Sequence, residues 1–234
     1  MNIKLSICEN LREIARNCLF LALFFSTVFA QDQQDFGIIS QLNIQKRFAN
    51  GFGISGAMRT QWSNNASEFS RIFGDLGAFY DLNQKWQIGA GFRFIENKKI
   101  NNLFEDESRF YADISYSTDL TDHISLSLRS KIQRSYFNLD RKEVTAPTDT
   151  RWRNRAQISY QWNWYSSTYV SAELFTPLDK TLRYPFNQLR TYIGYQYRIT
   201  RNHKIGVYYR YQKPLWEHPA ITRHILGLEY ALKL

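Results

Sequence analysis

The chain has 234 residues, with 30 Lys or Arg against 21 Asp or Glu, so its formal net charge at pH 7 is +9. Both of its cysteines, Cys8 and Cys18, precede residue 31, which excludes disulfides, thiol catalysis and cysteine-based metal sites from the part that follows. The positive charge alone does not indicate a nucleic-acid partner, because what matters is where the charges point. No nucleic-acid partner is therefore expected.

Residues 1–30 have the pattern of a secretory signal peptide. A basic start precedes an apolar run, and Val28 and Ala30 stand at the positions that a signal peptidase reads. The apolar run of about 12 residues is too short for a membrane-spanning helix, which needs about 20. We therefore expect cleavage after Ala30 and a single domain over residues 31–234.

After residue 35, apolar residues recur at every second position rather than with a helical period, which indicates β-strands. The segments run to about 10 to 14 residues, whereas strands of soluble proteins centre on about 5 to 6. The candidate segments are residues 36–47, 52–62, 69–82, 86–96, 107–120, 123–136, 151–162, 167–175, 186–199, 203–213 and 220–234.

Short turns and longer polar loops alternate between these segments, which is typical of bacterial outer-membrane barrels. Short turns are expected near residues 48, 82, 120 and 200, and longer loops near residues 63, 97, 138, 176 and 213. One parity of each segment is apolar, and the other carries Gly, Ser, Gln and Arg, which suits a wet interior. Aromatic residues lie near segment ends, as in interfacial girdles.

We therefore predict an all-β fold, a transmembrane antiparallel β-barrel with short periplasmic turns and longer extracellular loops, in the outer membrane of a Gram-negative bacterium. Bacterial single-chain barrels have even strand numbers, and eleven segments would make the first one enter from the wrong side. We predict twelve strands, with ten as the alternative. Either one strand is missed or residues 36–47 are not a regular member of the wall.

The last segment, residues 220–234, is expected to close the ring and so remove the exposed strand edge that lipid does not tolerate. Its alternating apolar residues resemble the signal that the barrel-assembly machinery receives, although the chain ends in Leu234 rather than in an aromatic residue. Expected partners are this machinery during biogenesis, outer-membrane lipid, and small anionic solutes.

If the apolar parity faces lipid, a set of cationic residues faces the lumen, toward the long-loop ends of the strands. We predict that they line the outer half of the lumen and are candidates for anion binding. They are Arg59, Arg71, Arg93, Arg109, Arg129, Lys131, Arg151, Arg153, Arg155, Arg190, Arg210 and Arg223. The clearest inward acids are Asp75, Asp113, Glu173 and Glu229.

Two interpretations of these cations stay open. In the structural one, a narrow barrel fills its interior with networks of arginine and carboxylate, which satisfy buried polar groups. In the functional one, rings of arginine confer a preference for anions. Because the cations outnumber the inward acids and an uncompensated buried guanidinium is costly, we expect water or an anionic guest to complete the network.

No catalytic residue, resident metal or cofactor is predicted. His224 falls on the outward parity near the outer leaflet, where a lipid-modifying enzyme could place a base, and Ser40 is the only candidate nucleophile. A triad needs its members in mutual reach, which the sequence does not establish. Glu105, Asp106 and Glu107 form an acidic cluster in a loop, which could hold a divalent cation but is more typically solvated.

Four stretches, QLNIQKRFANGFGISGAMRTQW, DLNQKWQIGAGFRF, RFYADISY and RNRAQISYQW, resemble the DUF2490 family of outer-membrane barrels. The likeness covers essentially all of residues 31–234 and implies a barrel without an established activity. The size and the arginine-lined lumen also resemble small oligogalacturonate-type porins, which are twelve-stranded. That likeness implies a narrow channel or binding barrel for small anionic solutes or oligosaccharides. The alternatives are a plugged structural or interaction barrel and an outer-leaflet lipid enzyme.

Overall fold

The computed structural model describes residues 33–98, 104–137, 148–179, 185–216 and 220–234. Within these ranges every regular element is a β-strand, as the two-residue period predicts. The strands are β1 (Gln33–Arg47), β2 (Phe52–Ser63), β3 (Glu68–Asp81), β4 (Trp86–Lys98), β5 (Phe104–Asp119), β6 (Ile124–Phe137), β7 (Thr148–Gln161), β8 (Ser166–Pro177), β9 (Gln188–Arg198), β10 (His203–Pro214) and β11 (Ile221–Lys233). No helix of the described residues is long and apolar enough to cross a membrane.

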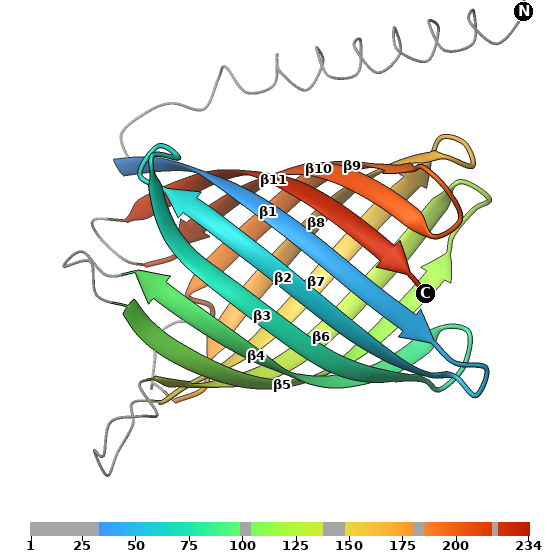
Figure 1. The fold of residues 1–234 in the computed structure, drawn as a ribbon, viewed down its shortest axis with the longest axis horizontal. Helices are drawn as coiled ribbons and strands as arrows, with labels where there is room; N and C mark the ends of the chain where they lie inside the picture. Colours follow the sequence, from blue (N-terminus) through green and yellow to red (C-terminus); the bar gives the residue numbers. More distant parts are fainter. Residues whose placement is uncertain (1–32, 99–103, 138–147, 180–184, 217–219) are drawn as a thin grey trace, which may run out of the picture. The chain divides into compact units, whose positions relative to one another are not determined.

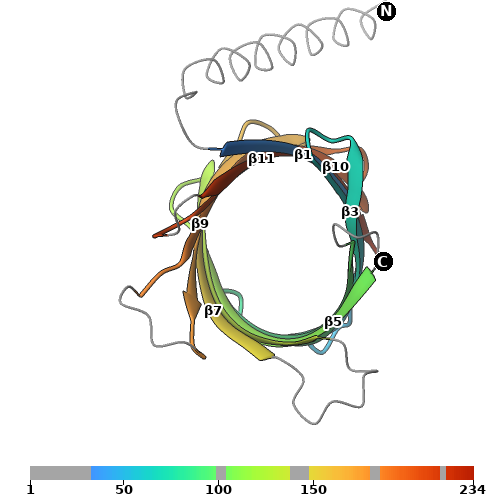
Figure 2. The ribbon, with the colours of Figure 1, turned by 90° about the vertical axis from the view of Figure 1, so that its left-hand side faces the viewer.

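The strands form a closed barrel in which each strand pairs with the next one in sequence and β11 pairs with β1 (Figure 1). Figure 2 shows the ring of strands end-on. All pairs of consecutive strands are antiparallel, so the chain runs up and down around the barrel. Closure leaves no edge unpaired among the eleven described strands, as expected of the last segment.

The predicted number of twelve strands, with ten as the alternative, is wrong, because the described residues close the ring with eleven. Residues 36–47 are a regular member of the wall, within β1. An odd number of strands in an up-and-down chain makes the first and last strands run in the same direction. β1 and β11 therefore pair in parallel, from Gln33 opposite Ile221 to Gln45 opposite Lys233. We call this parallel pair the seam.

The seam explains why the even-number rule failed for this chain. A parallel ladder satisfies the backbone donors and acceptors of both strands, as an antiparallel ladder does, at slightly lower stability per residue. The ring can therefore close without a twelfth strand. As a result β1 begins at the opposite end of the barrel from the end of β11 (Figure 1).

The connections differ between the two ends of the barrel. At one end β1 and β2 are joined by residues 48–51, and the Phe48 N–H donates to the Phe52 carbonyl at 2.8 Å. The same bond recurs in the other short turns of this end, for example from Leu82 to Trp86 at 2.9 Å. At the opposite end, the longer loop predicted near residue 63 is wrong, because β2 and β3 are joined by residues 64–67 alone. The loops predicted near residues 97, 138, 176 and 213 fall partly outside the described residues.

The wall is apolar outside and polar inside. Outward residues such as Leu76, Ile158 and Leu228 are 69%, 55% and 53% exposed. Polar residues of the inward parity, such as Gln61 and Gln212, are buried. This distribution is the reverse of that in a soluble protein, whose interior collects apolar side chains.

Inward aromatic rings lie over glycines of the neighbouring strand, directly opposite in register. A Cβ added to any of these glycines would come within 2.1 to 2.5 Å of the ring. Only glycine at these positions therefore avoids a clash with the ring. The pairs are Phe79 with Gly53, Tyr111 with Gly91, Tyr169 with Gly194, and Tyr208 with Gly227.

Candidate functional site

A cavity of about 470 Å³ lies inside the barrel, and its lining is dominated by cations. Two carboxylates, Glu173 and Glu229, belong to the same lining. The cations of this lining are Arg59, Arg71, Arg93, Arg109, Arg129, Lys131, Arg151, Arg153, Arg155, Arg190, Arg210 and Arg223. The structure thus brings together all the residues selected from the inward parity, and their binding of anions stays a prediction.

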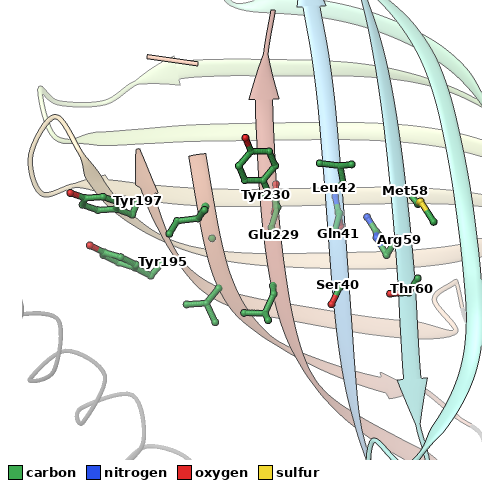
Figure 3. Close-up of a pocket in the computed structure, with 14 residues that line it drawn as sticks. Ser40, Gln41, Leu42, Met58, Arg59, Thr60, Tyr195, Tyr197, Glu229 and Tyr230 are labelled. Carbon is green, nitrogen blue, oxygen red and sulfur yellow. The ribbon is translucent and has the colours of Figure 1, made fainter. Parts of the chain in front are cut away.

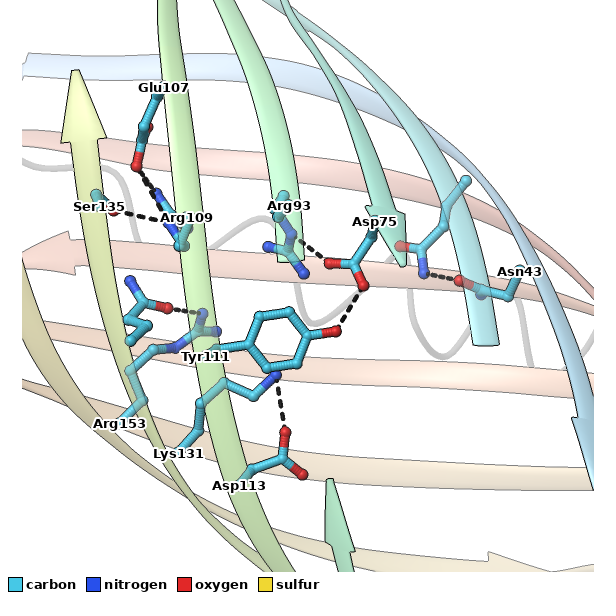
Figure 4. A network of polar contacts seen from close by, with 12 residues as sticks. Asn43, Asp75, Arg93, Glu107, Arg109, Tyr111, Asp113, Lys131, Ser135 and Arg153 are labelled. Atoms are coloured by element: carbon cyan, nitrogen blue, oxygen red, sulfur yellow. Dashed lines mark hydrogen bonds and ion pairs between the residues drawn. The ribbon is translucent and has the colours of Figure 1, made fainter. Parts of the chain in front are cut away.

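One part of the wall carries cations with ion partners. Arg93 Nε lies 2.6 Å from Asp75 Oδ2, and Arg109 Nη2 lies 2.5 Å from Glu107 Oε1. Ser135 Oγ also accepts a hydrogen bond from Arg109 Nε at 2.9 Å (Figure 4). These charges are therefore held in fixed geometry by neighbouring strands.

Glu173 is the most enclosed carboxylate of the lumen, with 1% of its surface exposed. Arg153 Nη2 reaches both of its oxygens, at 2.9 and 2.8 Å, and Arg129 Nη2 reaches Oε1 at 3.2 Å. Arg153 Nη1 also donates to Gln133 Oε1 at 2.9 Å. A single buried carboxylate thus compensates two guanidiniums from β6 and β7.

Tyr111 is the centre of a second network (Figure 4). Its hydroxyl donates to Asp75 Oδ1 at 2.7 Å, while the other oxygen of Asp75 binds Arg93. The Lys131 ammonium lies 3.6 Å from the centre of the Tyr111 ring and 3.1 Å from Asp113 Oδ2. Ring, carboxylates and cations fix one another across β3 to β6.

Five cations form no ion pair among the described residues. Each of them has a buried Nε without a hydrogen-bond partner in that part of the chain. They are Arg59, Arg71, Arg155, Arg190 and Arg210. Apart from Arg155, they come from β2, β3, β9 and β10, the strands that flank the seam on both sides. Positive charge without a carboxylate partner is therefore concentrated on the seam side of the lumen.

Two further cations of the lumen have ion partners of their own. Arg151 Nε is 2.6 Å from Asp149 Oδ2 on the same strand. Arg223 Nε is 3.8 Å from Asp35 Oδ2, and these two residues are opposite each other across the seam. The second pair is long and half-exposed, so it adds little fixed geometry.

Two aromatic rings of the lumen each contact two guanidiniums. The guanidinium carbons of Arg153 and Arg190 are 4.6 and 4.3 Å from the centre of the Phe175 ring. Those of Arg59 and Arg93 are 5.3 and 5.8 Å from the centre of the Phe73 ring. The rings hold the arginines in place by cation–π contact.

A second cavity of about 540 Å³ shares Arg59, Arg93, Arg129 and Lys131 with the first and reaches the short-turn end. It adds cations that the sequence analysis did not select, although the strand residues among them stand on the inward parity. They are Arg198, Arg201, Lys204 and Lys233. The parity could have identified three of them, whereas Arg201 lies in the turn between β9 and β10.

The outer wall carries an apolar hollow of about 580 Å³ across the seam (Figure 3). The small outward side chains of Ser40 and Thr60 lie between larger ones, such as Leu42, Met58 and Tyr230. The lining of this hollow also includes Gln41, Arg59 and Glu229, which line the cavity of the lumen as well.

The register does not support catalysis by His224 and Ser40. His224 Nδ1 contacts the hydroxyl of Tyr209. Ser40 pairs with Leu228, four residues along β11 from His224, a separation of about 13 Å at about 3.3 Å per residue. Ser40 is thus out of reach of His224.

The acidic cluster is not in a loop, because β5 begins at Phe104. Glu107 is turned inward to Arg109, and Asp106 stands on the opposite face of the strand. Among the residues that the structure describes, no group of three or more His, Cys, Asp or Glu could hold a metal ion.

Comparison with known proteins gives a family and several similar solved structures, among them two porins. The NanC porin, in a rhombohedral crystal form, has a TM-score of 0.48 and 15% identity, over 76% of this chain and 85% of that chain. The KdgM porin, in complex with disordered oligogalacturonate, has a TM-score of 0.47 and 18% identity, over 76% of this chain and 90% of that chain. No curated protein matches the chain. The family described as protein of unknown function (DUF2490) matches residues 36–214, and the chain belongs to this family.

Proposed function

We propose that the chain is a bacterial outer-membrane barrel whose lumen binds small anionic solutes and lets them pass. The lining of the central cavity carries this proposal, because twelve cations surround it with Glu173 and Glu229 as the acids of the same lining. Rings of arginine in a narrow pore favour anions. The cations that continue to the short-turn end extend the same field along the lumen.

The outer wall supports a place in a membrane. Outward side chains along the strands are apolar and exposed, as in Ile54, Leu76 and Val170. Exposed tryptophans such as Trp86 and Trp162 lie at strand ends next to the short turns, where the aromatic girdles of membrane barrels are found. Outer-membrane lipid, and the barrel-assembly machinery during biogenesis, are the partners that such a wall requires.

The bilayer experiment tests the channel directly. Refolded protein in a planar bilayer under a salt gradient is expected to give conductance steps with an anion-selective reversal potential. Arg155→Gln removes a lumen charge that forms no ion pair among the described residues, so it should lower the anion preference clearly. Arg153→Gln removes a charge that is paired with Glu173. Its effect on the anion preference should therefore be smaller than that of Arg155→Gln.

The control for this experiment is a surface charge of the same sign, Arg134, which contacts the Tyr136 ring at 5.4 Å on the outward parity. Arg134→Gln should leave the reversal potential unchanged. An unchanged potential in Arg155→Gln would remove that residue from the selectivity filter.

The proposed orientation puts the short turns in the periplasm and the other end of the barrel, with the 64–67 link, outside the cell. Because the part after residue 30 has no cysteine, single cysteines report sidedness without background. Asn65→Cys, in the 64–67 link, is expected to react with an impermeant thiol reagent on intact cells. Gln34→Cys should react likewise, because Ala66 N–H donates to the Phe36 carbonyl at 3.0 Å and so holds the start of β1 beside this link.

Asn202→Cys, in a short turn at the opposite end, is expected to react only after the outer membrane is permeabilised. Labelling of Asn202→Cys on intact cells, with Asn65→Cys protected, would reverse the orientation. Labelling of Gln34→Cys and Asn65→Cys on different sides would contradict the antiparallel pairing of β1 with β2, and with it the place of β1 in the seam.

A second candidate function is a plugged structural or interaction barrel. The observation that favours it is the burial of three apolar lumen-facing side chains, since Ile39, Ile225 and Phe175 are at most 1% exposed. Folded protein without conductance, with its fold verified by heat-modifiable mobility in gels, would favour this candidate.

The third alternative is an outer-leaflet lipid enzyme that uses His224. Full lipolytic activity in a His224→Ala variant would show that this residue is not needed for such an activity.

A further inference from the structure

We infer that the seam side of the lumen holds a binding site for a compact oxyanion with two or more negative charges, and that Arg210 is its centre. The inference rests on the proposed function, because solutes must reach the lumen. It adds the place of the site within the lumen and the class of anion that the site selects.

Arg210 is the most buried arginine among the described residues of the lumen. Only 6% of its surface is exposed, and its Nε has no hydrogen-bond partner among the described residues. On either side along β10, the inward residues are Tyr208 and Gln212, which are buried as well. Its guanidinium is therefore held within the wall of the cavity, facing polar and aromatic groups rather than a carboxylate.

Three further guanidiniums, those of Arg59, Arg71 and Arg190, line the same cavity as Arg210. Their charges repel that of Arg210, and they likewise form no ion pair in the described part of the chain. Bringing four guanidiniums together costs free energy through mutual repulsion and loss of hydration. An anion among them gains from all four, and the gain rises with each further negative charge that it carries.

The opposite side of the lumen does not offer the same site. Arg129 and Arg153 there share the carboxylate of Glu173 at 2.8 to 3.2 Å, and Arg93 is bound to Asp75. An anion would have to displace a well-placed carboxylate to bind these cations. The side of the lumen near the seam, where the cations have no carboxylate partner among the described residues, is therefore where an anion binds with the most favourable free energy.

Compact anions fit this site better than acidic sugars do. Sugar rings in binding sites stack on open aromatic faces, but Phe73 and Phe175 each have two guanidinium carbons at 4.3 to 5.8 Å from the ring centre, which compete with a sugar for contact with the ring. What the site presents is the planar N–H fork of arginine, which matches the oxygens of phosphate, sulfate or carboxylate. Tyr192, which stands opposite Arg210 in the register, and Tyr208 line the same cavity, and their hydroxyls are further hydrogen-bond donors.

The test is a calorimetric titration of the full refolded barrel in detergent. The titrants are inorganic phosphate, sulfate and chloride, each at the same constant ionic strength. Phosphate and sulfate are expected to bind with defined stoichiometry, and chloride much more weakly. Arg210→Gln should weaken the binding of sulfate by about tenfold or more, as for the loss of one charge-assisted hydrogen bond in a buried site. Arg210→Lys, which keeps the charge but not the fork, should be intermediate.

The matched control is Lys204→Gln, which removes one inward charge from the same strand near the short-turn end and should change the affinity for sulfate less than about twofold, as expected of a distant, screened charge. Equal losses in Lys204→Gln and Arg210→Gln would overturn the site, because the whole field would then be responsible. Heat-modifiable mobility verifies that each variant is folded.

A further titration with digalacturonate tests this inference separately from the proposed function. Tighter binding of digalacturonate than of phosphate, with anion-selective conductance retained, would overturn the compact-anion class and leave the channel intact. Absence of both anion binding and conductance in folded protein would overturn the proposed function itself.

Discussion

Replacing Gly227 by valine is expected to destabilise the folded barrel by about 3 kcal/mol, the upper part of the range for overpacking a filled interior. The new Cβ would lie 2.1 Å from Tyr208 Cζ, well inside any real contact distance. Tyr208 is 7% exposed and stands directly opposite Gly227 across β10 and β11. The ring therefore has to leave its place, next to the seam and two residues from Arg210. The free energy of unfolding from urea titration of the refolded protein measures the loss.

Gly74 provides the matched control for this substitution. A Cβ at Gly74 meets nothing within 4 Å, so Gly74→Val should change the free energy of unfolding by less than about 0.5 kcal/mol, as for most unconstrained surface positions. Equal losses in the two variants would show that valine in a strand, rather than contact with the ring, is the cause.

A double substitution separates the ring contact from other effects of valine at the seam. With Tyr208→Ala already present, Gly227→Val should cost much less than it does alone, because the ring that it strikes is gone. Such non-additivity is what residues in direct contact show. Additive losses would mean that Gly227 acts through the backbone of β11 and not through Tyr208.

The strand positions and the inward set of cations follow from local alternation, and so the sequence was sufficient to predict them. In β4, residues 86–96 were expected and Trp86–Lys98 are observed. The parity of Arg93 depends only on its distance from Trp86 along the chain, because successive side chains in a strand point to opposite faces. No knowledge of the neighbouring strands is needed for this step.

Closure could not be predicted in the same way. Which strand ends the ring depends on the pairing of β1 with β11, residues nearly 200 positions apart, and alternation is equally compatible with a parallel or an antiparallel ladder. The even-number rule describes what is usual among bacterial single-chain barrels, and this chain departs from it. The link at residues 64–67 was missed for a related reason, since polar residues next to a strand end can belong to the strands themselves.

The division of the cations into paired and unpaired ones also required the register. Arg155 stands opposite Glu173 in the register, yet the carboxylate is bound by Arg153 and Arg129. This choice depends on how the side chains lean across the lumen. The number of inward acids could be counted from the sequence, but their partners could not, and the concentration of unpaired charge beside the seam is visible only in three dimensions.

Replacing Glu173 by glutamine is expected to have the second large effect, a loss of about 3 kcal/mol, because breaking a buried ion pair leaves an uncompensated charge. Here two guanidiniums, those of Arg129 and Arg153, lose their common partner, whose side chain is 2% exposed. Glutamine keeps the size and one acceptor oxygen, so the loss reports charge and not a cavity. Urea titration measures the stability, and the reversal potential measures selectivity in the same variant.

Glu229→Gln is the matched control for Glu173→Gln. Glu229 lines the same cavity, but it forms no ion pair among the described residues and accepts a hydrogen bond from Asn43 Nδ2 at 2.8 Å. Its replacement removes the same charge and should cost no more than about 1 kcal/mol, the net value of one hydrogen bond. Both variants should shift the reversal potential toward anions, because the lumen becomes more positive in each. A loss of stability in Glu173→Gln no greater than in Glu229→Gln would show that water, rather than Glu173, compensates Arg129 and Arg153, and the paired side of the lumen would then be as open to anions as the seam side.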